Sequence, residues 1–216
     1  MKTEEFKVKD FSSIVAGGAF EIEIVRAESY SVSITADDDL FKNLKVAKEG
    51  ETLRIGHSKH LAWFSQITRP KARVTLPLLK GLHLSGATRG TVSGFDSSEN
   101  LKLNLSGASH VTGQITAGNV EFDLSGASHA ELAGSARDVI IDASGASRAE
   151  LDSFSVQKVA VKLSGASHTT IKTDGALDAR LSGASHLSWI GNPVMGDIRT
   201  SGASRLSKKI SLTQPE

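Results

Sequence analysis

A short phrase, Ser-Gly-Ala, recurs along most of the chain and constrains its fold more than any other feature. Successive copies are separated by 21, 19, 19, 20, 18 and 19 residues. A near-constant period of about 20 residues is typical of a fold built from stacked repeats. The copies begin at Ser85, Ser106, Ser125, Ser144, Ser164, Ser182 and Ser201.

Apolar and polar residues alternate in the segments that precede the phrase, such as 101–105, 120–124, 139–143 and 159–163. Alternation with a period of two indicates a strand with one buried face. No window of convincing length shows the period of an amphipathic helix, and the fixed leucines of a leucine-rich horseshoe are missing. We therefore predict an all-β fold.

A single repeat of this size cannot bury its own apolar face, so successive repeats must stack against one another. The strands of neighbouring repeats then run parallel, and parallel crossovers are right-handed in about 98% of cases. The prediction is a single-stranded right-handed parallel β-helix, a solenoid with coils of about 20 residues.

Each residue of the phrase has a structural reason to be present. Glycine permits a corner conformation and a close approach of the next coil, alanine fits a narrow corner, and serine can hydrogen-bond to the backbone at the bend. We expect a glycine in the middle of the stack, such as Gly126, to tolerate substitution least. Gly86 and Gly202, near the ends of the repeat array, are expected to tolerate it better.

The repeat pattern divides one domain into three segments. Residues 1–79 are strand-rich and are expected to form an N-terminal cap, residues 80–207 hold the β-helix repeats, and residues 208–216 form a C-terminal tail. The stretch VAGGA at 15–19 is a weak copy of the phrase. The acidic run at 37–39 lacks the ligand spacing of a calcium loop and predicts a capped turn or short helix.

Composition excludes several functions. The chain has 216 residues, with 25 basic and 24 acidic side chains and a net charge of +1, so nothing in its charge favours nucleic acid or an anionic membrane. It has no cysteine, which excludes disulfides and thiolate metal sites. The charged start MKTEEFKVKD has no apolar run behind it, so we expect no signal peptide in this sequence and no membrane-spanning segment.

The basic residue that ends each copy of the phrase is the first candidate for function. Its neighbours one and three positions further on are apolar in most copies, so we expect these side chains to point outward and stack as a surface ladder. Stacking with like charges should lower the pKa of the histidines beside an arginine. The ladder consists of Arg89, His110, His129, Arg148, His168, His186 and Arg205.

Two functional uses of this ladder are open besides a solvated surface. Arginine and histidine can both contact an anion, such as an acidic glycan. Metal binding by the pairs His110/His129 or His168/His186 is the other use. We expect no metal site, because Arg148 interrupts the column and no carboxylate recurs at a fixed offset to complete the ligand set.

The stretch HSKHLAWFSQITRP at 57–70 has no strand pattern and carries an aromatic pair, Trp63 and Phe64. Such a pair most often packs on a neighbouring sheet. The alternative is a contact site for a partner subunit or a sugar ring.

No catalytic or nucleotide-binding motif is present, so we expect a non-enzymatic protein without a cofactor. A carbohydrate-active β-helix enzyme is the alternative, and it would need clustered carboxylates. The acidic residues of the repeats are scattered, and they include two at equivalent offsets, Asp123 and Asp142, two residues before their serines. A further alternative is a homo-oligomeric assembly module whose open C-terminal coil stacks on another subunit.

Several stretches together resemble a known bacterial family. They are FSSIVAGGAFEIEIV at 11–25, the segment 30–55, and TLPLLKGLHLSGA at 75–87 followed by the LSGAS repeats. The chain is similar to the head GIN domain of auto-transporter adhesins from about Phe6 to about Ser207. The resemblance implies a β-helical binding or structural module that is extracellular or in the cell envelope, and it supplies no site residues.

Overall fold

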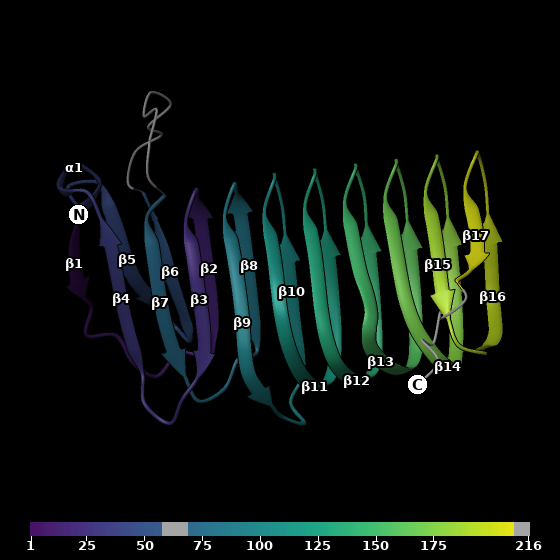
Figure 1. The fold of residues 1–216 in the computed structure, drawn as a ribbon, viewed down its shortest axis with the longest axis horizontal. Helices are drawn as coiled ribbons and strands as arrows, with labels where there is room; N and C mark the ends of the chain where they lie inside the picture. Colours follow the sequence, from purple (N-terminus) through teal and green to yellow (C-terminus); the bar gives the residue numbers. More distant parts are fainter. Residues whose placement is uncertain (58–68, 210–216) are drawn as a thin grey trace, which may run out of the picture.

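The repeats form the stacked parallel coils of a β-solenoid of about seven turns in the computed structural model, which describes residues 1–57 and 69–209 (Figure 1). Strands make up 68% of the structure and helix 2%, which confirms the predicted all-β solenoid. No helix among the described residues is long and apolar enough to cross a membrane. In chain order the elements are β1 (Lys2–Glu5), β2 (Ser13–Gly18), β3 (Glu21–Arg26), β4 (Ser31–Ala36), α1 (Asp38–Phe41), β5 (Leu44–Glu49), β6 (Thr52–His57), β7 (Lys71–Leu76), β8 (Gly81–Gly86), β9 (Arg89–Asp96), β10 (Leu101–Leu105), β11 (His110–Leu124), β12 (His129–Ala143), β13 (Arg148–Leu163), β14 (His168–Leu181), β15 (His186–Ile190), β16 (Val194–Thr200) and β17 (Arg205–Lys208).

Each coil carries two strand segments that run in opposite directions and meet at narrow turns along one side of the stack (Figure 1). The Ser-Gly-Ala phrase forms these turns, and the residues on either side of it stack on their equivalents in the next coil, whereas the register shifts further along the strands. Leu105 pairs with Leu124, and His110 pairs with His129. The inward residues of the alternating pattern, including Phe122 and Phe154, are fully buried in one continuous core.

The glycine of the phrase has two reasons to lack a side chain. Gly126 has a φ of 72°, which L-residues with a Cβ rarely adopt. A Cβ built on Gly126 would also lie 2.6 Å from the carbonyl oxygen of Gly107 in the adjacent coil. That same carbonyl accepts a hydrogen bond of 2.7 Å from the N–H of Ala127, so the two turns cannot move apart cheaply.

The order of coils in space differs from their order in the chain. The coil made by β2 and β3 lies between two others: β8 and β9 pair with it on one side, and β6 and β7 on the other, all in parallel register. Gly18 pairs with Gly86, so VAGGA occupies the position of the phrase. A Cβ on Gly86 would meet the Gly18 carbonyl oxygen at 2.5 Å, so the expected greater tolerance at Gly86 has no basis in the packing.

Antiparallel strands occupy the N-terminal end of the stack (Figure 1). β5 pairs with β6, β4 pairs with β7, and β1 pairs with the outer edge of β4. The short helix α1 follows Asp37 and has two acidic residues in its first turn, in agreement with the short helix expected at the acidic run. β2, β3, β6 and β7 belong to the same stack as the repeats.

Candidate functional site: a polar face along the solenoid

The predicted ladder exists as a continuous column on one face of the stack. Parallel pairing joins Arg89 to His110, His110 to His129, and so on to Arg205 at the start of β17. The three arginines are exposed and the four histidines are partly buried. The outward direction predicted from the alternation is therefore observed.

The column is longer than the sequence indicated. Glu21 pairs with Arg89, and Lys71 pairs with Glu21 on the other side. Glu21 follows the VAGGA turn as Arg89 follows its Ser-Gly-Ala turn, so treating VAGGA as a true copy would have placed it in the column. Lys71 follows the segment 58–68 and has no copy of the phrase to reveal it.

A second outward column runs beside the first, two residues further along each strand. Its members carry hydroxyl groups in most coils and carboxylates in the middle of the repeat array. They are Thr91, Thr112, Glu131, Glu150, Thr170, Ser188 and Ser207. Thr170 and Ser188 are buried, so the hydroxyl groups that a polar ligand can reach beside the nitrogen donors lie toward the two ends of this column.

A groove with a volume of about 900 Å³ lies on this face, over the N-terminal part of the column. Gly90, which has no side chain, lines the groove between Ile22 and Val111 of the two neighbouring coils, and Thr91 lines it next to Gly90. Its polar lining comes from β3, β4, β7, β9, β11 and β12. The charged and imidazole side chains that line it are Glu21, Glu23, Lys71, Arg73, Arg89, His110 and His129.

Arg89 differs from the other cations of the groove. Arg73 donates a hydrogen bond of 2.7 Å to Glu23, and Lys71 lies 4.0 Å from Glu21. Arg89 makes no hydrogen bond or ion pair within the part of the chain that the structure describes, residues 1–57 and 69–209. No described residue therefore competes with an anionic group in the groove for the donors of this guanidinium.

The histidines of the column are arranged in two edge-to-face pairs. The rings of His110 and His129 have centroids 4.5 Å apart, and those of His168 and His186 are 4.6 Å apart, with an interplanar angle of 78° in both pairs. Burial lowers the pKa of His110, and the nearby His129 and Arg89 lower it further. Burial is also the largest cause that lowers the pKa of His168, and the nearby His186 and Arg148 lower it further. The lowering expected beside arginines is found, but burial is its larger cause.

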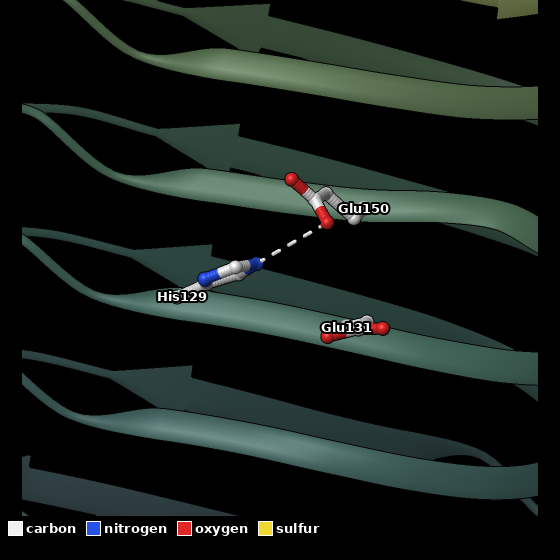
Figure 2. A group of neighbouring side chains, drawn as sticks. All are labelled: His129, Glu131 and Glu150. Carbon is white, nitrogen blue, oxygen red and sulfur yellow. Dashed lines mark ion pairs between the residues drawn. The ribbon is translucent and has the colours of Figure 1, made fainter.

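His129 forms a cluster with two carboxylates. His129, Glu131 and Glu150 each offer one ligand atom, and these three atoms lie within 4.8 Å of one another (Figure 2). The expectation of no metal site assumed that no carboxylate recurs at a fixed offset. Glu131 and Glu150 do share an offset, and the parallel register places them on adjacent coils.

The carboxylate pair considered for an enzyme lies in another setting. Asp123 pairs with Asp142 across adjacent coils, on the strand segments that precede the phrase. Lys162, from the next coil, donates a hydrogen bond of 2.8 Å to Asp142, and both partners are largely exposed. Asp142 is therefore part of a surface ion pair, and Asp123 is an exposed residue on the adjacent coil.

The aromatic pair Trp63 and Phe64 lies outside the described residues.

Comparison with known proteins places this architecture in a family. The profile described as "Putative auto-transporter adhesin, head GIN domain" matches residues 10–193. A solved structure of a "putative adhesin" from Bacteroides fragilis superposes with a TM-score of 0.88 at 20% identity, covering 96% of each chain. A "putative lipid binding protein" from Parabacteroides distasonis gives a TM-score of 0.73 at 19% identity, also over 96% of each chain. A search of curated proteins found no match.

Proposed function

Because the chain belongs to the head GIN domain family of auto-transporter adhesins, we propose that it is a non-enzymatic binding module of the cell surface or envelope. We assign binding to the groove around Arg89, and the ligand to an acidic glycan or a similar polymer with carboxylate, sulfate or phosphate groups. Membership of this family supports a binding role, and the side chains that line the groove support an acidic ligand.

The observation that carries the proposal is an arginine without a described partner in a groove lined by hydroxyl and imidazole groups. Arginine binds carboxylates and phosphates through two parallel hydrogen bonds, and such charge-assisted bonds are about twice as strong as neutral ones. His110, from the next coil, adds a second nitrogen donor, and the hydroxyls of Thr91 and Thr112 can bond sugar hydroxyls.

The shape of the face fits a polymer. Equivalent side chains recur at each coil, about 4.8 Å apart, and continue beyond the groove toward β17. A chain-like ligand can therefore meet several rungs at once, and weak contacts at successive rungs add to the affinity. An isolated small molecule would use only the groove.

Binding to a glycan array with acidic and neutral glycans tests this function. We expect the purified protein to bind acidic glycans and to release them as the salt concentration rises, because exposed charge contacts are screened. Vesicles with an anionic headgroup and neutral vesicles form a parallel arm, since one structural neighbour is described as lipid-binding. Binding to neutral glycans alone, or to anionic vesicles with no glycan bound, would contradict the proposal.

A further inference from the structure

We propose that His129, Glu131 and Glu150 form a binding site for a divalent cation of the zinc type. The site uses three protein ligands and leaves the remaining coordination positions to water or to a ligand oxygen. It rests on the contacts of these three side chains alone and does not depend on the proposed glycan-binding function.

The fold brings the three residues together. His129 and Glu131 point to the same side of β12, since they are two residues apart on one strand, and Glu150 on β13 is the direct partner of Glu131 (Figure 2). The Nε2 atom of His129 lies 3.7 Å from Oε2 of Glu150. All three ligand atoms lie within 4.8 Å of one another.

These separations are close to those of ligands on one ion. Zinc binds nitrogen and oxygen at about 2.0–2.2 Å, so two ligands at angles between 90° and 120° stand about 3.0–3.7 Å apart. The His129–Glu150 separation meets this limit. Glu131 is exposed and makes no hydrogen bond or ion pair with the described residues, so no such contact opposes rotation of its side chain toward the other two ligand atoms.

The Nε2 atom of His129 lacks a hydrogen-bond partner. Its side chain is 28% exposed as a whole, but Nε2 itself is buried and makes no hydrogen bond with the described residues. A distance of 3.7 Å is too long for a hydrogen bond to the carboxylate. A buried nitrogen without a partner destabilises the fold, and a cation between Nε2 and the two carboxylates would satisfy it.

Arg148 fits this arrangement as an outer partner. Its guanidinium donates a hydrogen bond of 3.3 Å to Oε1 of Glu150, which leaves Oε2 to face His129. Carboxylates that bind metals are commonly held by such a second contact. The two glutamates bring two negative charges against the single positive charge of Arg148, so the cluster attracts a cation.

The composition of the cluster selects the ion. Imidazole favours zinc and similar transition metals, whereas sites for calcium and magnesium use oxygen ligands only. No other histidine of the ladder has a carboxylate two residues further along its own strand, because Thr112, Thr170 and Ser188 occupy the positions that Glu131 holds beside His129. His168 therefore serves as a matched control, being partly buried in the same column.

Calorimetric titration of the untagged protein with zinc chloride at neutral pH is the test. We expect one zinc per chain and a loss of affinity of more than about tenfold in His129→Gln, Glu131→Gln and Glu150→Gln. His168→Gln should bind zinc as the wild type does. In parallel thermal melts, zinc should raise the Tm of the wild type and of His168→Gln, and should leave the Tm of the three other variants unchanged.

Three results would overturn the site. The first is no zinc binding by the wild type, and the second is equal affinity in the three ligand variants. The third is a loss of affinity in His168→Gln as large as in His129→Gln, which would move binding to the other histidine pair. Titration with calcium chloride completes the test, because calcium binding that survives in His129→Gln would show a carboxylate site without the imidazole. Circular dichroism establishes that each variant keeps the strand spectrum.

Discussion

At the scale of single residues, the glycine of the phrase is a position where the fold has no room for a side chain. Gly126→Val would place a branched side chain at a positive φ and against the Gly107 carbonyl. We expect a loss of about 2–4 kcal/mol in the free energy of unfolding, from backbone strain and from the clash together. Gly56→Ala is the control, since its added Cβ meets only the Gly17 carbonyl oxygen at 3.8 Å. Urea denaturation measures the free energy of unfolding of both variants. An equal loss in Gly126→Val and Gly56→Ala would contradict the packing explanation.

The histidines of the column predict a dependence of stability on pH. The pKa values of His110 and His168 lie below the ordinary value of 6.5, chiefly because both rings are partly buried. A lowered pKa means that the unfolded chain takes up the proton more readily than the folded one. The stabilisation is therefore complete above pH 6.5 and is lost as the pH falls through the lowered pKa values.

We expect the Tm of the wild type to fall more between neutral and mildly acidic pH than that of the double variant His110→Gln/His168→Gln. Titration of the imidazole proton signals by NMR gives the two pKa values directly. Signals that titrate at or above 6.5 would show that burial does not control these rings.

At the scale of elements, strand β1 closes an edge that would otherwise be open. β4 pairs with β7 on one side and with β1 on the other, and β4, with the sequence SVSITA, carries no charge. β1, with the sequence KTEE, places charged side chains on the outer edge, which discourages pairing with another chain.

Deletion of residues 1–5 should therefore lower the Tm and produce association that depends on protein concentration in size-exclusion chromatography. Thr3→Ala removes the side-chain hydrogen bond to Thr35 but keeps the backbone pairing of β1 and its three charged side chains. It should associate no more than the wild type at concentrations where the deletion variant associates. A deletion variant that is as stable as the wild type and associates no more than it does would show that β1 does not protect this edge.

The repeat elements could be predicted from the sequence, but their order in space could not. Period-two alternation and the spacing of the phrase gave the strands, the turns and the parallel register, because these depend on local residues. The two edges of the β2–β3 coil are equivalent in hydrogen bonding. No local sequence pattern shows that the β6–β7 coil pairs with one edge of the β2–β3 coil and the β8–β9 coil with the other edge. That choice depends on the connections between strands and on the packing of the whole core.

At the scale of the whole molecule, the candidate site was predicted in part. The outward direction of the ladder followed from the alternation, since Ala130 and Leu132 beside His129 had to point inward. The groove was not predicted, because it needs Lys71 and Arg73 from a coil placed there by the unexpected stacking order. The carboxylates beside His129 were visible in the sequence, and only the register showed that they meet.

The central claim is that the groove around Arg89 binds an acidic polymer. Surface plasmon resonance with immobilised polygalacturonate, a polymer of carboxylated sugars, measures it by comparing the wild type, Arg89→Ala and Arg205→Ala. The two variants lose the same charge from the same column, but Arg205 lies in the last described coil, away from the groove. We expect Arg89→Ala to weaken binding more than about tenfold, as for loss of a charge-assisted hydrogen bond, and Arg205→Ala to change it less than about twofold. No binding by the wild type, or equal weakening in both variants, would contradict the account.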